Sequence, residues 1–583
     1  MPGLIGIKKV GKSLTHNLQE GMQLMSYGKT QTYDQIYEDH FLTASRVHLK
    51  KIGEKSSPFV FKGNYCWLDG EIYNLQEVAN KYRLEITSFP ELLIAAYLDK
   101  NLFEQILSEI DGYFSAVIYD KENFKIAIIS DRYGLKPLYI WNQGNKFGWA
   151  SEMKAFLAIP DFDISIRNGA LDCFMTIGHM MGNITWFDNV ELMEPSTILT
   201  YSLTESNIID KHKYWSWSCI KPQIISFEEA ASSMGDMIVD AVRRRWDKSS
   251  RFGISLSGGL DSRAILASLE DTSDIVAYTF GKKNCLDIEI ASRVSKLKGV
   301  KHIIKEINAD NWFDNRSLGI WKTDGMLNLL HMHDTAVSNA FSELVDINLS
   351  GFLGDALEGG LHLHGKAYNC RINQDIATRL YKDFSKYSPF DDNYFDIEHV
   401  DVYVFNNLNR RFTNLGITLD SRTVEQRLPF LDNRLIEFVY SLPDDYRINS
   451  KLYNASLLKR LPTFYENIPW QRTGIPISKK QNRYLRFISR KADKFFDKIG
   501  INQDLTDYFD YNKWFKEINI YHVFTKILDP KYAIYQNYTD QNYITKYLTP
   551  HFKGTKDYSR ELGLALTTEI WFQQIFNKTN RLS

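Results

Sequence analysis

The stretch of this chain that decides its fold reads Ser255-Leu256-Ser257-Gly258-Gly259-Leu260-Asp261-Ser262. Apolar residues alternate over residues 252–256 before it and recur at helical spacing over residues 262–270 after it. The two glycines let the backbone turn tightly and approach a ligand with no Cβ in the way. The segment therefore predicts a strand, a tight turn and a helix in direct succession.

Such a turn has the chemistry of a phosphate-binding loop. Its amide groups and those of the helix N-terminus are expected to point at an anion, with the hydroxyls of Ser257 and Ser262 as further donors. Asp261 is placed to hold a Mg²⁺ ion that neutralises phosphate charge. The alternative is a glycine-rich turn that binds nothing, which the flanking strand and helix patterns disfavour.

Alternating strand and helix patterns surround this turn. A succession of βα units predicts a parallel, doubly wound sheet whose ligands bind beyond the C-terminal ends of the strands. From about residue 375 the chain becomes helix-rich and aromatic. The expected strands cover residues 275–280, 302–307 and 346–350, and the expected helices cover residues 227–246 and a face made by Ile290, Val294 and Leu297.

The first 200 or so residues have a different pattern. Short aromatic and β-branched runs alternate with turn-forming clusters, and two helix-like segments interrupt them, which predicts antiparallel β layers with segregated helices. The expected strands are residues 65–68, 113–119, 124–129 and 138–141, and the expected helices are residues 91–98 and 102–110.

Composition narrows the functional class. The 583 residues suggest roughly two to four domains, and 70 Lys plus Arg against 71 Asp plus Glu disfavour a nucleic-acid partner. We find neither a signal peptide nor an apolar run long enough to cross a membrane. The five cysteines are scattered and never spaced as C-x-x-C, as in reduced thiols of a cytoplasmic protein.

The residues of the loop carry a family resemblance. Ser257 to Ser262 resembles the pyrophosphate-binding loop of ATP-pyrophosphatases, and nearly the whole chain resembles asparagine synthetases. The other matching motifs, in chain order, are Asp69-Gly70-Glu71-Ile72-Tyr73-Asn74, Asp111-Gly112-Tyr113-Phe114, Asp131 to Tyr139, Ala150 to Ala155, Ser350-Gly351-Phe352-Leu353-Gly354-Asp355 with Gly359-Gly360, Arg427 to Asp432, and Glu569 to Phe572.

The resemblance implies two domains and a two-step reaction. Residues 1–215 resemble a type 2 glutamine amidotransferase domain of Ntn-hydrolase-like fold. Residues 225–583 resemble the synthetase domain, an adenine nucleotide α-hydrolase-like sheet with a helical extension. A carboxylate oxygen attacks the α-phosphorus of ATP to give an acyl-adenylate and pyrophosphate, and an amine then displaces AMP to form an amide.

The resemblance also implies the site residues. Asp261 and Asp355 are the expected Mg²⁺ ligands and catalytic carboxylates, and Lys451 is the expected catalytic cation, because Ala455 stands where the family has its lysine. A solvated loop lysine is the alternative for Lys451, and a helix-surface arginine is the alternative for Arg263, where the family more often has a small residue. The expected ATP-binding residues are Ser255, Leu256, Ser257, Gly258, Gly259, Leu260, Asp261, Ser262, Arg263, Phe280 and Gly354.

The first domain departs from the family at three positions of its glutaminase site. Family members use an N-terminal cysteine, whereas Pro2 and Gly3 stand here and the nearest cysteine is Cys66, inside a predicted strand. Asp69 replaces the asparagine that helps to stabilise an oxyanion, and Phe89 replaces the acid that binds the amino group of glutamine. We expect a structural domain that hydrolyses no glutamine.

The second domain departs from the family in its second metal motif. Two usually acidic positions hold Phe352 and Ala356, which leaves Asp355 and Glu358 as carboxylates. Asp324, in a Thr-Asp-Gly sequence, either lines the pocket of the reacting acyl group or is a turn residue. The departures at Phe352, Ala356 and Ala455 bear on the expected acceptor chemistry and number of metal ions more than on the expected ATP site.

Two further patterns resemble binding motifs but are not expected to bind a ligand. Residues 6–13 match the spacing of a Walker A loop but lack the strand and helix context that this loop requires. The pairs His331/His333 and His362/His364 have no further zinc ligands grouped nearby in the sequence.

Three hypotheses remain. The first is an ATP- and Mg²⁺-dependent ligase, like β-lactam synthetases and lasso-peptide cyclases. It would join a small-molecule or peptide carboxylate other than free aspartate to ammonia or an amine. The second is a conventional glutamine-hydrolysing asparagine synthetase, and the third is a non-catalytic scaffold on a decayed fold. A homodimer or a pathway partner protein stays open.

Overall fold

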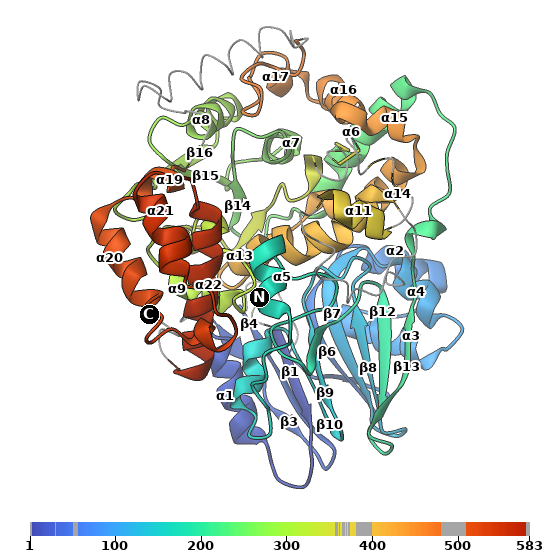
Figure 1. Cartoon of the computed structure of the whole chain (residues 1–583). Helices are drawn as coiled ribbons and strands as arrows, with labels where there is room; N and C mark the ends of the chain where they lie inside the picture. Colours follow the sequence, from blue (N-terminus) through green and yellow to red (C-terminus); the bar gives the residue numbers. More distant parts are fainter. Residues whose placement is uncertain are drawn as a thin grey trace.

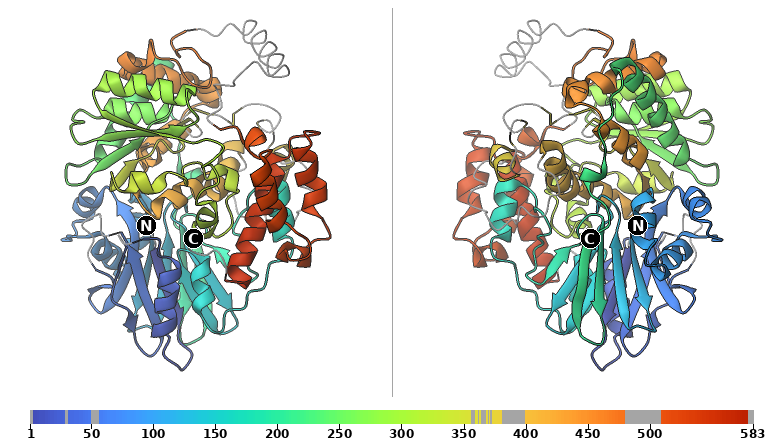
Figure 2. Two further views of the ribbon diagram at one scale, coloured as in Figure 1. Left: turned by 90° about the vertical axis from the view of Figure 1, so that its left-hand side faces the viewer. Right: turned by 90° about the vertical axis from the view of Figure 1, so that its right-hand side faces the viewer.

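The computed structural model describes residues 3–28, 31–49, 56–355, 359–360, 362–363, 368, 370, 373–380, 399–479 and 509–578. Antiparallel sheets form the lower part of Figure 1, a parallel sheet with its helices forms the upper part, and C-terminal helices lie along one side. Figure 2 shows the same layers from both sides. The predicted fold class, an Ntn-like antiparallel domain followed by a doubly wound parallel sheet, is confirmed.

Two antiparallel sheets make up the first domain. The first has the strand order β11-β9-β10-β1-β4-β2, with β3 paired to β4, and the second has the order β13-β12-β8-β7-β6-β5. The strands are β1 (Gly3–Lys8), β2 (Thr32–Tyr33), β3 (Tyr37–Glu38), β4 (Leu42–His48), β5 (Phe59–Phe61), β6 (Asn64–Ile72), β7 (Gly112–Asp120), β8 (Lys125–Ser130), β9 (Tyr139–Gln143), β10 (Lys146–Ala150), β11 (Val190–Leu192), β12 (Thr197–Ser202) and β13 (Asn207–Lys213). The helices are α1 (Thr15–Leu24), α2 (Leu75–Tyr82), α3 (Phe89–Leu98), α4 (Phe103–Glu109), α5 (Ala170–Ile177) and the 3-10 turn η1 (Met153–Ala158).

The position of strand β1 shows that the Walker A match in residues 6–13 is not a phosphate-binding loop. Its residues pair antiparallel with β4 and β10, so Gly6 to Lys8 lie inside an antiparallel sheet. A phosphate loop of that type needs a parallel βαβ unit. The rejection of this motif is confirmed.

A parallel sheet is the centre of the second domain, with the strand order β16-β15-β14-β17-β18. Each strand predicted here is present, but Leu297 is 47% exposed and does not belong to the buried face of its helix, so that part of the prediction is wrong. The strands are β14 (Phe252–Ser255), β15 (Val276–Gly281), β16 (Lys301–Glu306), β17 (Ile347–Leu349) and β18 (Glu425–Arg427), and the flanking helices are α6 (Phe227–Arg244), α7 (Asp261–Ser268) and α8 (Leu286–Lys298).

Strand order places a ligand site in this sheet. After β14 the chain adds β15 and β16 on one side, and later β17 and β18 on the other. A crevice at such a switch point lies beyond the C-terminal ends of the two central strands. The turn after β14 and the segment after β17 therefore meet at the same edge.

Helices complete the second domain. Those after the sheet include α16, which packs against α6, and α22, which packs against α9 and α5. Their bounds are α9 (Arg316–Lys322), α10 (Ser338–Ser342), α11 (Asn373–Leu380), α12 (Val400–Val404), α13 (Asn414–Ser421), α14 (Asn433–Ser441), α15 (Asp444–Arg447), α16 (Lys451–Arg460), α17 (Pro462–Tyr465), α19 (Tyr511–Trp514), α20 (Ile518–Ile527), α21 (Thr549–Phe552) and α22 (Ser559–Phe576). Among the helices that the structure describes, none combines the length and apolarity that crossing a bilayer requires.

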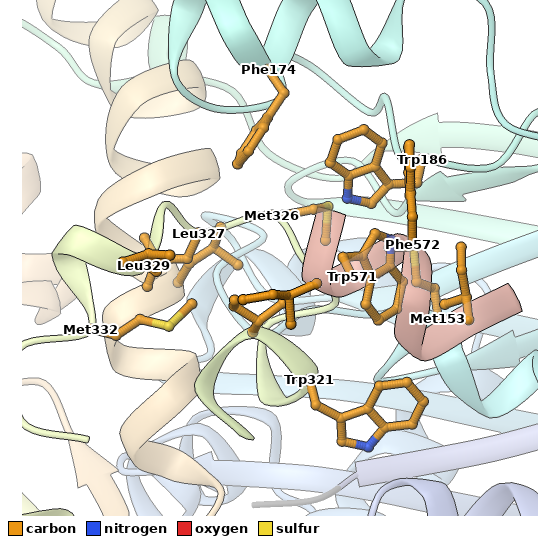
Figure 3. Packing of buried hydrophobic residues seen from close by; sticks show 14 of the residues in the cluster. Met153, Phe174, Trp186, Trp321, Met326, Leu327, Leu329, Met332, Trp571 and Phe572 are labelled. Carbon is orange, nitrogen blue, oxygen red and sulfur yellow. The ribbon is translucent and has the colours of Figure 1, made fainter. Parts of the chain in front are cut away.

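One hydrophobic core crosses the boundary between the domains. Figure 3 shows Met153 and Trp186 of the first domain among the aromatic side chains of α9 and α22. The ring centroids of Trp186 and Phe572 lie 5.4 Å apart, and those of Trp321 and Trp571 lie 5.7 Å apart. Aromatic pairs at this distance contribute beyond their buried area. The two domains therefore share their interior.

Candidate active site

The glycine-rich turn begins where β14 ends. The amide of Ser255 donates to the side-chain carbonyl of Asn348 on β17, at 3.0 Å. The amide of Leu256 donates to the backbone oxygen of Tyr278 on β15, at 2.9 Å. The start of the turn is thus fixed to both neighbouring strands.

Side chains satisfy three amides of the turn. The amide of Ser257 donates to the Ser262 hydroxyl at 3.2 Å, and that of Gly259 donates to the Ser257 hydroxyl at 3.1 Å. The amide of Gly258 donates to the Asp287 carboxylate at 2.8 Å. Ser257 and Ser262 therefore shape the turn. Asp287, in the first turn of α8, is a residue that no sequence motif had indicated.

The start of α7 provides the free donors. The amides of Leu260, Asp261 and Ser262 have no acceptor among the residues that the structure describes. The first amides of a helix lack intrahelical acceptors and carry its positive dipole end. This arrangement favours an anion beside the start of α7.

Asp261 and Asp355 meet at this edge of the sheet. One carboxylate oxygen of Asp261 accepts the amide of Asp355 at 3.0 Å, and the other accepts the hydroxyl of Tyr453 at 2.6 Å. Gly354 permits this approach, because a Cβ there would lie 2.5 Å from the carboxyl carbon of Asp261. Burial and the negative charge of Asp355 raise the pKa of Asp261 to about 8. A divalent cation bound between two such carboxylates would relieve their repulsion, so the pair has the chemistry of a cation-binding site.

Lys451 begins α16, the helix that carries Tyr453. Its side chain is exposed, and the preceding Ser450 donates its hydroxyl to the backbone oxygen of Gly359 at 3.0 Å. Lys451 therefore lies next to the second glycine motif, at the edge of the site. Tyr453, which contacts Asp261 directly, was absent from the sequence prediction because no local pattern distinguishes it from a core tyrosine.

Phe280, Phe352 and Leu353 are apolar parts of the surroundings. Phe280 lies near the end of β15, and its ring centroid is 6.5 Å from that of Phe341. Phe352 and Leu353 are buried in the core cluster that includes Tyr133 of the first domain. Phe352 therefore packs in the core at a position that is usually acidic in the family, while Ala356 and Glu358 lie outside the described residues.

Arg263 lies neither beside the phosphate position nor on the helix surface, the two places expected from the sequence. Its side chain is fully buried, and its guanidinium donates to backbone carbonyls, among them Gly258 at 3.1 Å and Pro469 at 2.7 Å. A second arginine, which no sequence motif indicates, lies near the turn. The amide of Gln471 donates to the backbone oxygen of Gly258 at 3.1 Å, and the next residue, Arg472, is exposed.

Asp324 does not line an acyl pocket. It is buried at the boundary between the domains, where it accepts the amide of Met153 and the ammonium of Lys154, both at 2.9 Å. Its φ of 51° places it in a left-handed turn, so the turn alternative is the correct one.

The histidine pairs form no zinc site in the described part of the chain. No three His, Cys, Asp or Glu side chains come close enough there to hold a metal ion. His333 stacks on Phe509, with ring centroids 4.4 Å apart. His364 lies outside the described residues.

The residues at which the first domain departs from the family motif contact other side chains of that domain. Asp69 is buried and forms an ion pair with the ammonium of Lys136 at 3.0 Å. A Cβ on Gly3 would lie 2.1 Å from the Cβ of Ser151 and 3.2 Å from a carboxylate oxygen of Asp69. Burial raises the pKa of Cys66 to about 12, which leaves its thiol unreactive.

Comparisons with known proteins agree with this architecture. Residues 1–215 match a family model described as a glutamine amidotransferase domain, and residues 234–395 and 413–462 match one described as asparagine synthase. A probable asparagine synthetase of Acanthamoeba polyphaga mimivirus is 26% identical over 74% of this chain and 76% of its own length. A putative asparagine synthetase of Methanocaldococcus jannaschii is 24% identical over 76% of both chains.

A third relative, asparagine synthetase 1 of Bacillus subtilis, is 23% identical over 58% of this chain and 54% of its own length. Both domain types thus occur in the order that the motifs predicted. The chain belongs to the asparagine synthetase family and is an ATP-dependent carbon–nitrogen ligase that forms amides.

Proposed function

We propose that the chain adenylates a carboxylate other than free aspartate and joins it to ammonia or to an amine, without hydrolysing glutamine. In the first step a carboxylate oxygen bonds to the α-phosphorus of ATP, and the bond from that phosphorus to the β-bridging oxygen breaks to release pyrophosphate. In the second step the amine nitrogen bonds to the acyl carbon, AMP leaves with the electron pair, and the nitrogen loses a proton.

The turn after β14 is the proposed pyrophosphate site. The free amides of Leu260, Asp261 and Ser262 support this role, because they are donors fixed in place before the leaving group acquires its charge. Ser255, Leu256, Ser257, Gly258 and Gly259 shape the turn. Phe280 provides an apolar surface for the nucleotide, and Gly354 provides close approach.

Asp261 and Asp355 are the proposed Mg²⁺ ligands. Mg²⁺ is commonly bound by one or two carboxylates together with substrate phosphates, and this pair fits that pattern. When bound, the ion would spread the negative charge that develops on the phosphates. Tyr453, by donating to one oxygen of Asp261, orients that carboxylate toward Asp355.

Two cations are candidates for stabilising charge in the transition state. Lys451 is exposed beside Gly359, as described above. Arg472 follows the residue whose amide binds the turn itself, and its guanidinium lies 5.6 Å from the ring centroid of Trp470. A planar guanidinium binds phosphate oxygens in pairs, which a lysine cannot do.

The buried Asp69–Lys136 pair is the observation that carries the proposal about the amine source. Asp69 stands at the position where a glutaminase has a hydrogen-bond donor that stabilises an oxyanion. A carboxylate paired with Lys136 cannot donate such a hydrogen bond. The amine therefore comes from solution, from the substrate itself or from a partner protein.

The proposal extends to the setting of the reaction. We infer a cytoplasmic enzyme, since Cys66, Cys173, Cys219 and Cys285 form no disulfide, as expected for a reducing compartment. A homodimer and a complex with a pathway partner are both compatible with this reading.

Pyrophosphate release over a panel of carboxylic acids tests the proposal. Each acid is assayed with ATP and Mg²⁺, with ammonia, with glutamine or with neither, and the Asp261→Asn variant is the blank. Release that depends on an acid other than aspartate, with no glutamate formed from glutamine, supports the proposal. Pyrophosphate release with aspartate alone, or glutamate formed at the same rate as pyrophosphate, contradicts the proposal. Either result would mean that the chain is a conventional glutamine-hydrolysing asparagine synthetase. If no acid drives ATP–pyrophosphate exchange, the adenylation proposal fails.

A further inference from the structure

Arg263 makes an unusual set of contacts for a buried arginine. Its guanidinium donates to four backbone carbonyls: Gly258 in the turn, and Phe464, Ile468 and Pro469 in the segment that follows α16. The four donor–acceptor distances lie between 2.7 and 3.4 Å. One side chain thus connects the phosphate-binding turn to a segment about 200 residues later.

The positive charge of Arg263 has no negative partner in the described chain. No carboxylate lies within ion-pair distance, and its Nε–H has no acceptor. A second cation, Arg293, lies on the same side and contacts the backbone oxygen of Asn467 at 3.5 Å. A buried charge that only carbonyl dipoles stabilise is costly unless an anion comes close.

The same segment holds the turn through two further bonds. The hydroxyl of Tyr465 donates to the backbone oxygen of Leu260 at 2.7 Å, while its ring lies under the guanidinium of Arg263 with a centroid distance of 5.4 Å. The amide of Gln471 donates to Gly258, so Arg472 stands immediately beyond the turn. Residues 464–472 therefore form one wall of the turn, that is, a segment that lies along it and is hydrogen-bonded to Gly258 and Leu260.

We infer that Arg263 is a positioning residue: it fastens the wall of residues 464–472 to the phosphate-binding turn, and the polyphosphate of the bound nucleotide is the counter-charge of its buried guanidinium. This inference rests on the proposed binding of ATP at the turn. Both terminal nitrogens of Arg263 donate to backbone carbonyls, so we assign this side chain no direct contact with the phosphates. It acts through the turn and through the placement of Arg472.

Binding of Mg²⁺-ATP and of inorganic pyrophosphate to the full chain, measured by calorimetry, tests the inference. Arg263→Met removes both charge and contacts and is expected to weaken both ligands by roughly tenfold or more, as for loss of bonds from a charged donor. Arg263→Lys keeps the charge without the four contacts and should recover only part of the affinity. Arg293→Met, which removes a cation on the same side that does not bind the turn, should change affinity less than about twofold.

Hydrogen exchange supplies a readout that overall destabilisation would not reproduce. In Arg263→Met and Arg263→Lys the amide of Gln471 should exchange faster while amides of β7 keep their protection. Should Arg263→Met fail to fold, Arg263→Lys and Tyr465→Phe, which loses only the hydroxyl bond to Leu260, carry the same comparison.

The outcomes separate the two claims. If the unmodified protein binds neither ligand, the proposed function fails and the inference fails with it. If the unmodified protein binds them and the Arg263 variants bind equally well, the inference alone is overturned. Weaker binding in Arg293→Met by the same factor as in Arg263→Met would also overturn it, because a general charge effect would then suffice.

Discussion

The carboxylate of Glu71 accepts hydrogen bonds on both of its oxygens from the guanidinium of Arg427, each at 2.8 Å. Glu71 lies on β6 of the first domain, and Arg427 is the last residue of β18 in the second. The backbone oxygen of Arg427 accepts the amide of Ser350, where the segment leading to Asp355 begins. Hydrogen bonds through Arg427 thus connect a motif of the first domain to the segment that leads to the proposed metal site.

Replacing Glu71 by Gln should destabilise the protein through this contact. The amide cannot accept on both sides, so part of a buried bidentate ion pair is lost, and we expect the free energy of unfolding to fall by about 1–3 kcal/mol. Urea denaturation measures the change. Glu77→Gln is the matched control, because Glu77 also binds an arginine of the second domain, Arg244, but is 58% exposed. Its effect should stay within about 0.5 kcal/mol, and equal effects in both variants would contradict the special role of Glu71.

Replacing Asp261 by Asn should abolish ATP–pyrophosphate exchange. The amide retains the shape and the bond from Tyr453 but loses the charge that a divalent cation requires, so we expect a loss on the order of 10²-fold or more. Exchange is followed with labelled pyrophosphate. Near-normal exchange in this variant would exclude Asp261 as a metal ligand.

Lys451→Ala and Arg472→Ala distinguish the two candidate cations. The one that stabilises the transition state should lower kcat by roughly 10²-fold with little change in the KM for ATP. The other should leave kcat within about twofold, as expected for an exposed charge. Unchanged kcat in both variants would mean that neither residue has this role.

Replacing Lys136 by Met should destabilise the first domain severely. Asp69 would remain buried without its partner, which typically costs about 3–5 kcal/mol. The double variant Asp69→Asn with Lys136→Met should recover part of this loss, because the uncompensated charge is gone. Thermal unfolding compares the three proteins, and a Lys136→Met variant as stable as the unmodified protein would contradict the ion pair.

Stability should fall as the pH is lowered from about 6.5 to 4, partly through His179. Burial lowers the pKa of this imidazole to about 4, so between these pH values the unfolded chain binds a proton that the folded chain does not. The protonated unfolded state is then favoured, by up to about 3 kcal/mol at pH 4. His179→Gln should reduce this slope in denaturation curves recorded across the range. An unchanged slope would assign it to other groups.

The fold and the turn could be predicted because their signals are local. Alternation over residues 252–256 and helical spacing over residues 262–270 follow from contacts between near neighbours in sequence, and β14 and α7 appear there. Strands β1 and β4 were not predicted, because their burial depends on partners far away in the chain.

Side-chain directions could not be predicted in the same way. The motif places Arg263 beside the turn, but which side its guanidinium faces depends on the carbonyls of residues 464–469, some 200 residues later. Tyr453 and Asp287 touch the turn only through tertiary packing. Lys451 was predicted because Ala455 stands where the family has its lysine, and a search for a displaced lysine cannot find an arginine such as Arg472.

The shared interior around Trp186 and Trp571 gives the first domain a role in a chain for which we propose no glutaminase activity. A chain truncated to the second domain would expose the apolar side chains of α9 and α22 to solvent. Such a chain would be prone to aggregation and proteolysis. Residues needed for glutamine hydrolysis can therefore be replaced one by one during evolution, while the first domain remains necessary for the folding of the second.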